Sequence, residues 1–225
     1  MKRIAMLHTV KSVYESFPQE LRAALSELNE EVKFHNILDD FLADDPADTG
    51  KFSKTNKLRL LSDLQVMQMT GADLIVVTCS TLSPAVAELR PLMQTRIVTI
   101  DEAMMKKAVL TAEKIGLLAT ACSTIGPSQF KLAEEAEKVG RRLQVETIHD
   151  EEAVRSLKRG DRIRHDEIVL KMGRKLHDPE LVVLAQASMA HMKEPLASEL
   201  GVPVLASPEL CIQQIREILT SEAEG

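Results

Sequence analysis

The sequence predicts an α/β protein built from two similar halves, each organised around a parallel sheet. Short apolar runs of strand length alternate with segments of helical pattern along the 225 residues. Four of these runs recur in the same order at nearly constant spacing, which indicates an internal duplication. Small hydroxyl residues follow several of the runs, at the strand ends where open α/β sheets bind ligands.

The composition excludes several classes of function. A formal net charge of −6, an aromatic content of 3% and the absence of Trp argue against nucleic-acid binding. Three cysteines without a close pair form neither a disulfide framework nor a zinc motif. The apolar runs are far shorter than the roughly 20 residues of a membrane span, and the first is too short for a signal peptide. We therefore expect a cytoplasmic protein without a membrane partner.

The duplication consists of four pairs of strand-like segments. They are 4–9 and 115–120, 32–39 and 143–150, 74–81 and 181–188, and 97–102 and 204–209. The first two pairs are 111 residues apart (115 − 4 and 143 − 32) and the last two are 107 apart (181 − 74 and 204 − 97). We expect a first lobe at residues 1–100 and a second at 101–207, with 208–225 packing back on the first.

Within the first half, strands are expected at residues 4–7, 32–37, 74–77 and 97–100. Ser16 and Gln19 have the spacing of a capping box, which predicts a helix start. Residues 39–55, rich in Asp, Gly and Ser, predict a long loop that is either a binding lid or a solvated excursion. A helix over 58–70 follows.

The same half continues with two further helix starts. Ser83 is a good N-cap, and Pro84 suits the first turn after it. Asp101 and Glu102 open the next helix, where acidic residues are ordinary partners of the helix dipole.

The second half is expected to repeat this order. Its first strand is predicted to begin at residue 115. The other three are predicted at 143–148, 181–185 and 203–206. Its helices are predicted at 126–139, 151–159, 163–176 and 208–219.

One strand end of the first half carries the strongest signal for chemistry. Cys79, Ser80 and Thr81 come just after the apolar run 74–77 and just before the helix start at Ser83. The positive end of a helix dipole favours a thiolate at such a position. A free cysteine is most often a small buried hydrophobe, but the hydroxyl-rich setting favours a functional Cys79.

Hydroxyl residues follow other predicted strands as well. They are Thr9, Thr120, Ser123, Thr124 and Ser188. Two facing halves would bring these strand ends into one cleft, where neutral O–H and N–H donors suit a small carboxylate. Thr120 and Thr124 have an alternative role, because Ser and Thr often cap helices.

The other cysteines and histidines carry weaker predictions. Cys122 fits a catalytic and a structural role equally, whereas Cys211 lies on an apolar helix face and is expected in the core. His8 has the pattern of a core histidine. His191 is the acid/base group nearest in sequence to Ser188, and it is either a surface residue or a proton-transfer group.

Neither a metal site nor a phosphate loop is predicted. His165 and Asp166 lie together on a charged helix, which favours a solvated face over a metal site. Gly50 and Gly71 are isolated, and neither G-x-G-x-x-G nor G-x-x-x-x-G-K-[ST] occurs.

Four motifs together resemble the aspartate/glutamate/hydantoin racemase superfamily over most of the chain. They are 77–81 (VTCST), 101–104 (DEAM), 115–120 (IGLLAT) with Thr124, and 184–189 (LAQASM). The resemblance implies two α/β lobes related by a pseudo-twofold axis, a site in the cleft between them and no cofactor. It also implies that one cysteine from each lobe flanks the substrate's α-carbon, one removing the α-proton and the other returning it.

Carried over by resemblance, Cys79 is the thiol of the first lobe. The implied substrate-binding residues are Thr9, Ser80, Thr81, Thr120, Thr124, Gln186, Ala187 and Ser188. Gln186 stands where the second cysteine is expected, and an amide cannot exchange protons near neutral pH. A two-base mechanism would therefore need another group, for which Cys122 and His191 are weak catalytic candidates.

We expect a cofactor-independent racemase- or isomerase-like enzyme that transfers a proton through a thiol at the α-carbon of a small carboxylate, amino acid or hydantoin. The alternatives are a single-thiol decarboxylase or lyase-like enzyme, an enzyme with a nucleophilic Cys79, and a non-catalytic small-carboxylate binding protein. The expected partners are a small carboxylate or carbonyl substrate and, by resemblance, a second copy in a homodimer.

Overall fold

A computed structural model describes residues 1–28 and 31–223 of the chain. The chain divides into two compact units, one comprising Met1–Asp101 with the segment from Pro208 onward and the other Glu102–Ser207. Each unit has a four-stranded parallel sheet flanked by helices, so the α/β prediction is confirmed. None of the helices in the described ranges combines the length and apolarity that crossing a membrane requires.

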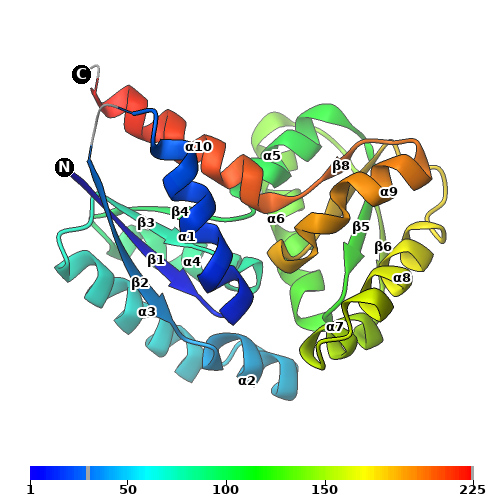
Figure 1. The fold of residues 1–225 in the computed structure, drawn as a ribbon, viewed down its shortest axis with the longest axis horizontal. Helices are drawn as coiled ribbons and strands as arrows, with labels where there is room; N and C mark the ends of the chain where they lie inside the picture. Colours follow the sequence, from blue (N-terminus) through cyan, green and yellow to red (C-terminus); the bar gives the residue numbers. More distant parts are fainter. Residues whose placement is uncertain (29–30, 224–225) are drawn as a thin grey trace. The chain divides into compact units, whose positions relative to one another are not determined.

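In the first unit, the sheet order is β2-β1-β3-β4, with all neighbours parallel (Figure 1). Its strands are β1 (Lys2–His8), β2 (Val32–Leu38), β3 (Leu74–Val77) and β4 (Arg96–Thr99). Its helices are α1 (Lys11–Leu25), α2 (Phe41–Thr49), α3 (Lys54–Met69), α4 (Ser83–Leu89) and α10 (Ser207–Ala223), with the 3-10 helices η1 (Ser80–Leu82) and η2 (Arg90–Leu92).

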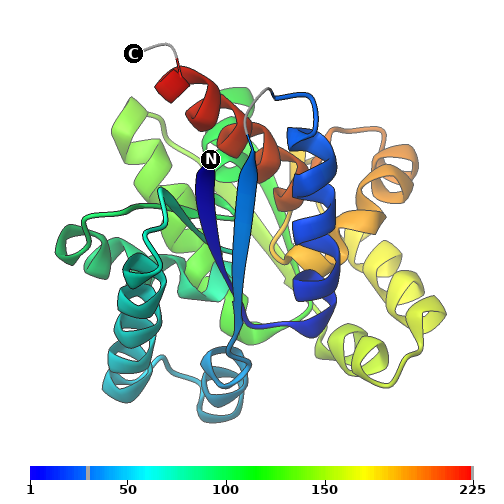
Figure 2. The same ribbon diagram turned by 60° about the vertical axis from the view of Figure 1, so that its left-hand side comes forward.

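Side-chain alternation gives this sheet two apolar faces. Ala5 and Leu7 of β1 pack in one core cluster with Leu60 and Leu64 of α3. Because successive residues of a strand point to opposite faces, Met6 is buried on the other side. Figure 2 shows α1 and α3 on opposite faces of the sheet. The fully buried strands explain why their sequence is continuously apolar.

The second unit repeats the same topology, with the sheet order β6-β5-β7-β8 and all neighbours parallel. Its strands are β5 (Lys114–Ala119), β6 (Gln144–His149), β7 (Leu181–Leu184) and β8 (Val204–Leu205). Its helices are α5 (Glu102–Thr111), α6 (Ile125–Val139), α7 (Glu151–Lys158), α8 (Arg162–Gly173) and α9 (Lys193–Leu200), with the 3-10 helices η3 (Cys122–Thr124) and η4 (Ala187–Met192). The shared strand order supports the duplication that the sequence repeat indicated.

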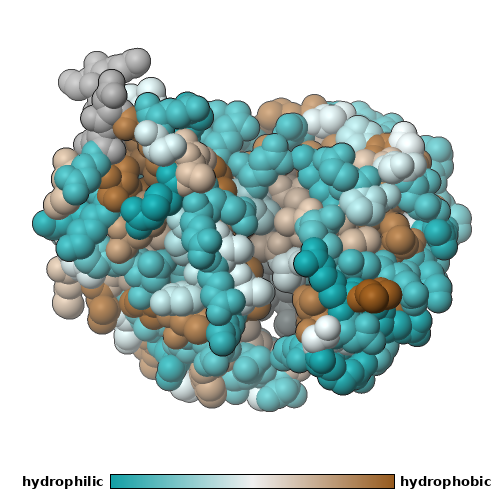
Figure 3. All heavy atoms as spheres, viewed as in Figure 1, coloured by the Kyte–Doolittle hydropathy of each residue, from teal (hydrophilic) through white to brown (hydrophobic). Residues whose placement is uncertain are grey.

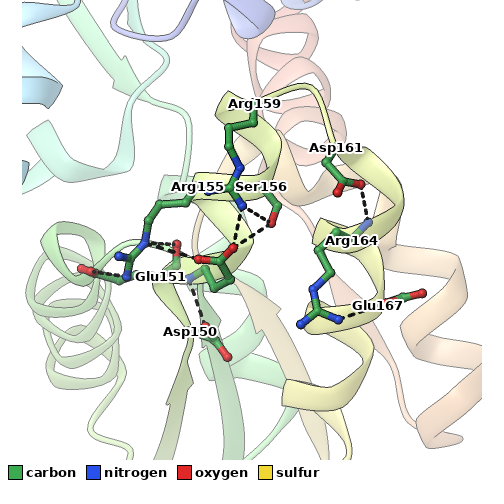
Figure 4. Close-up of polar contacts among 9 residues, drawn as sticks. Asp150, Glu151, Arg155, Ser156, Arg159, Asp161, Arg164 and Glu167 are labelled. Carbon is green, nitrogen blue, oxygen red and sulfur yellow. Dashed lines mark hydrogen bonds and ion pairs between the residues drawn. The ribbon is translucent and has the colours of Figure 1, made fainter.

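Helices α7 and α8 begin at aspartate caps (Figure 4). The Asp150 carboxylate accepts a hydrogen bond from the backbone N–H of Glu152 at 3.0 Å, and Asp161 accepts one from Arg164 at 3.0 Å. Each cap satisfies a backbone donor that the first turn leaves free. The cap at Asp161 therefore fixes the start of α8, and with it the position of His165 in the following turn.

Residues 39–55 are not a loop, which corrects the prediction of a lid or a solvated excursion. They contain α2, and Ser53 then caps α3. Leu42 and Pro46, four residues apart, are buried on one face of α2, and Gly50 ends the helix with a left-handed φ of 73°. The acidic residues of α2, which suggested a loop, lie on its outer face. Only Leu42 and Pro46 of this helix are buried, so its apolar face is too small to stand out in the sequence.

The first helix begins earlier than predicted. Helix α1 starts at Lys11, so Ser16 and Gln19 lie inside the helix and form no capping box. Its buried stripe begins at Val13 and continues through Phe17, so packing against the sheet determines where this helix starts.

Apolar side chains on the surface are interspersed with hydrophilic ones on the face shown in Figure 3. The most exposed large apolar residues are Met69 (82%) and Ile163 (77%), which lie in different units. Single exposed apolar residues are normal for globular proteins and mark no site on their own.

Candidate active site

Cys79 lies just past the carboxyl end of β3, in extended backbone that leads into η1. Hydrogen-bond donors surround its sulfur: the Thr9 hydroxyl, the backbone N–H and hydroxyl of Thr81, and the Leu82 N–H. Burial raises the pKa of the Cys79 thiol, these donors lower it, and burial prevails. Cys79 as a whole residue is partly buried.

The backbone N–H groups of Thr81 and Leu82 lower the pKa of the Cys79 thiol, but the net direction of its pKa is upward. The helix that follows directly is η1, a 3-10 helix of three residues with a weak dipole, and desolvation of the charged sulfur outweighs the nearby donors. At neutral pH the group is therefore a protonated thiol, which is the form that can give up a proton.

Thr9 directly follows β1 and lies beside this sulfur. Its side chain is 4% exposed, and its hydroxyl forms no hydrogen bond in the part of the chain that the structure describes. The hydroxyl nevertheless lies close enough to Cys79 to lower the pKa of the thiol. An ionised sulfur or a bound carboxylate could therefore accept a hydrogen bond from this hydroxyl, which has no other acceptor among the described residues.

His8 is a core histidine, as its sequence pattern suggested. Its Nδ1 lies 2.9 Å from the Thr78 hydroxyl and its Nε2 lies 3.1 Å from the side-chain oxygen of Asn36. Burial lowers the pKa of His8, which keeps the imidazole neutral. Both ring nitrogens are occupied by the fold, so His8 supports the strand end and is not a proton-transfer group.

Ser83 does not cap α4, which corrects the prediction for this residue. It is the first residue of the helix, and its hydroxyl donates to Oδ1 of Asp101 at 2.7 Å. Pro84 lies in the first turn, as predicted. Asp101 is fully buried, so it ties α4 to the segment after β4 instead of facing solvent at a helix start.

In the second unit, Gln186 lies just past β7 and is joined to Thr120, just past β5, by two hydrogen bonds. The Thr120 backbone N–H donates to Oε1 of Gln186 at 2.9 Å. The Gln186 amide nitrogen donates to the Thr120 hydroxyl oxygen at 2.8 Å. The Thr120 N–H is thereby engaged, while its hydroxyl proton remains available for an acceptor such as a carboxylate.

Thr124 and Cys122 lie on η3, which follows β5. Thr124 is the N-cap residue of α6 but its side chain does not cap the helix, and its hydroxyl donates instead to the carbonyl of Ala121 at 2.7 Å. Cys122 is exposed, and its hydrogen bond to the Glu151 carboxylate raises the pKa of the thiol. The negative charge of Glu151 opposes formation of a second thiolate there.

His191 lies on η4, three residues after Ser188, and is not an isolated surface residue. Its Nε2 is 2.7 Å from Oδ1 of Asp166, and the same oxygen is 2.7 Å from Nδ1 of His165. His165 is fully buried, so the prediction of a solvated face for this stretch of α8 is wrong. The alternating charges of α8 concealed a histidine that points into the unit.

The structure thus groups the expected residues within each unit. In the first unit, Thr9 and Thr81 lie beside the Cys79 thiol and Ser80 follows it in sequence, and all three hydroxyl residues are buried. In the second unit Gln186 joins Thr120, and η4 carries Ala187 and Ser188 just after it. Cys211 is buried in α10, as predicted.

Sequence reasoning missed the contributions of Leu82, Glu151 and Asp166. The Leu82 backbone N–H could have been expected from a helix start after Cys79. The contacts of Glu151 and Asp166 join residues 29 (151 − 122) and 25 (191 − 166) positions apart, and no local pattern predicts them.

Solved structures with a similar fold include racemases. Glutamate racemase isoform RacE1 from Bacillus anthracis is 17% identical, with a TM-score of 0.72 over 98% of this chain and 82% of that chain. Allantoin racemase from Klebsiella pneumoniae is 18% identical, with a TM-score of 0.65 over 99% and 89%. An aspartate racemase homologue from Pyrococcus horikoshii OT3 is 17% identical, with a TM-score of 0.67 over 98% and 100%. At these identities the likeness shows the fold alone.

No curated protein sequence matches this chain. The family model that does match is Asp/Glu/Hydantoin racemase, over residues 6–215, which is nearly the whole chain. This match supports a racemase-like, isomerase function. From the family model together with the shared fold, we conclude that the chain belongs to the Asp/Glu/Hydantoin racemase family.

Proposed function

We propose that this protein is a cofactor-independent isomerase that moves a proton at the α-carbon of a small carboxylate, amino acid or hydantoin, with Cys79 as the proton-transfer group. The observation that carries the proposal is the setting of Cys79 at a strand end, among the donors of Thr9, Thr81 and Leu82. Family membership supports the reaction type.

In the proposed step, the Cys79 thiol first releases its proton to solvent. The thiolate then takes the α-proton, so that the C–H bond breaks and an S–H bond forms. The electron pair of the C–H bond moves to the neighbouring carbonyl or carboxylate oxygen, which becomes an enolate. Hydroxyl and N–H donors beside that oxygen would stabilise its developing charge. The proposed donors are Ser80, Thr81 and the Thr120 hydroxyl.

Inversion needs a second group that returns a proton to the opposite face of the α-carbon. Gln186 cannot do so, because an amide does not exchange protons near neutral pH. Cys122 and His191 are the proposed alternatives, the first restrained by Glu151 and the second hydrogen-bonded to Asp166.

A single-thiol lyase is the second candidate function, and the Gln186–Thr120 pair favours it. In that reaction a C–C bond breaks, CO₂ leaves, and the electron pair stays on the α-carbon. Cys79 then protonates the carbanion, a role that suits a thiol whose pKa is raised. A non-catalytic protein that binds a small carboxylate is the third candidate.

The test is α-proton exchange in D₂O, followed by NMR over glutamate, aspartate, allantoin, other hydantoins and substituted malonates. Wild type is compared with Cys79→Ala and with Cys122→Ala as a matched thiol control. We expect Cys79→Ala to lose about 10²–10⁴-fold of the exchange or CO₂-release rate, the usual contribution of a general acid or base.

The outcomes separate the three candidates. Exchange with loss of optical activity supports the isomerase, and CO₂ release with deuterium incorporation supports the lyase. Exchange that persists in Cys79→Ala removes Cys79 from the mechanism. A compound that raises the melting temperature without any turnover leaves only the binding protein.

A further inference from the structure

Three side chains of the second unit converge outside the Cys79 setting. His165 and Asp166 lie on α8, and His191 lies on η4. One carboxylate oxygen, Oδ1 of Asp166, is 2.7 Å from Nδ1 of His165 and 2.7 Å from Nε2 of His191. One potential ligand atom from each of the three residues lies within 4.8 Å of the others.

The donor set suits a divalent transition metal. Two imidazole nitrogens and one carboxylate oxygen are ligands of zinc-class ions, whereas magnesium and calcium prefer oxygen alone. A tetrahedral site with bonds of about 2.0 Å holds its ligand atoms roughly 3.3 Å apart. The carboxylate oxygen and the two nitrogens would therefore separate by only roughly 0.6 Å to admit the ion.

The chemistry of the cluster permits metal binding. The two nitrogens that face Asp166 would have to be free of protons, which a neutral imidazole achieves by carrying its proton on the other ring nitrogen. The Asp166 carboxylate would supply the negative charge. The nearby guanidinium of Arg162 approaches the other carboxylate oxygen, Oδ2, at 3.9 Å and leaves Oδ1 to the two imidazoles.

Burial makes one side of the cluster rigid and the other accessible. His165 is fully buried, so its ring is held in place by the packing of the unit. The side chains of Asp166 and His191 are 31% and 25% exposed, which gives an ion a path from solvent.

We propose that His165, Asp166 and His191 bind one zinc-class divalent ion, in which case His191 is a ligand and not the second proton-transfer group. The ion would replace the two hydrogen bonds to Asp166 with three coordinate bonds and join η4 to α8. Because η4 starts just after Gln186, the ion would fix the loop at the carboxyl end of β7. The solvent-exposed side leaves a fourth position for water.

The test is calorimetric titration of the tag-free, chelator-treated full-length protein with ZnCl₂. We expect one ion per chain and a higher melting temperature with zinc. His191→Ala and Asp166→Asn, both at partly exposed positions, are expected to weaken binding by at least about tenfold, since each removes one of three protein ligands. Their circular dichroism should match wild type, which separates loss of a ligand from loss of the fold.

His177→Ala is the matched control. His177 pairs with Glu146 at 2.7 Å on the surface of the same unit, and among the described residues no third ligand group joins this pair. Co²⁺ supplies a spectroscopic check, because thiolate ligands from Cys79 or Cys122 would add a sulfur-to-metal charge-transfer band that nitrogen and oxygen ligands lack. Absence of binding, binding unchanged in His191→Ala, an equal loss in His177→Ala, or a thiolate band would each overturn the proposal.

Discussion

The first and third strands of the two units lead into matched pairs of residues, Thr9 with Cys79 in one unit and Thr120 with Gln186 in the other. In the second unit, two hydrogen bonds of 2.9 and 2.8 Å join the pair, and the Thr120 N–H and both ends of the amide are used. In the first unit, the Thr9 hydroxyl is buried without a hydrogen bond of its own, beside a thiol.

The difference gives the two pairs different proposed roles. Buried polar groups normally have partners, so the Thr9 hydroxyl, which lies beside a thiol and lacks a hydrogen bond among the described residues, is a candidate contact for a ligand or a charged sulfur. The fully bonded Gln186 amide at the matching position contributes to stability and joins two strand ends. We therefore expect loss of the polar groups of the first pair to change chemistry, and loss of the hydrogen bonds between Thr120 and Gln186 to lower stability.

The largest effect is expected from placing a thiol in the second unit. Gln186→Cys adds a proton-transfer group at the matched position, with Gln186→Ala as the control that loses the same two hydrogen bonds. We expect racemisation of an exchanging substrate to rise in Gln186→Cys alone, toward the lower end of the roughly 10²–10⁴-fold contribution of a general acid or base. Chiral chromatography of the products measures this rise, and equal rates in the two variants would disprove a shared role for the two positions.

The next effect compares Thr120→Val with Thr9→Val in chemical denaturation. Thr120→Val leaves the Gln186 amide without its acceptor, so we expect the free energy of unfolding to fall by about 1–3 kcal/mol. Thr9→Val removes a hydroxyl that has no hydrogen bond, so we expect no loss of stability, or a small gain. A fall of similar size in both variants would remove the distinction between the pairs.

The smallest effect concerns the pH dependence of the first pair. Burial raises the pKa of the Cys79 thiol, so its alkylation by iodoacetamide should reach half-maximal rate above the ordinary pKa of 9.0. Thr9→Val removes a donor to the thiolate and should move that midpoint further upward. Peptide mass spectrometry follows Cys79 and Cys122 in one sample, and a midpoint below 9.0 at Cys79 would contradict the expectation.

The raised pKa of Cys79 also makes the free energy of unfolding depend on pH in a defined direction. The folded chain holds the thiol proton more tightly than the unfolded chain, so the contribution of this group is full below the unfolded pKa. It is lost as the pH rises through the folded pKa. The stability difference between wild type and Cys79→Ala should therefore become less favourable to wild type at alkaline pH.

The sequence by itself determined the strands, their repeated order and the place of Cys79 at a strand end. These features depend on local apolar runs and on Pro84, which fix element type without reference to distant residues. The structure confirms the α/β class and all eight strands, with boundaries that differ by up to two residues.

Only the tertiary structure decided which polar groups are satisfied. The bond between Thr120 and Gln186 spans 66 residues, and the bond between Asp166 and His191 spans 25. The burial of His165 and the raised pKa of Cys79 likewise depend on what packs around them, as does the formation of α2 around Leu42. Desolvation and long-range hydrogen bonds arise from neighbours that are distant in sequence, and a local pattern carries no record of them.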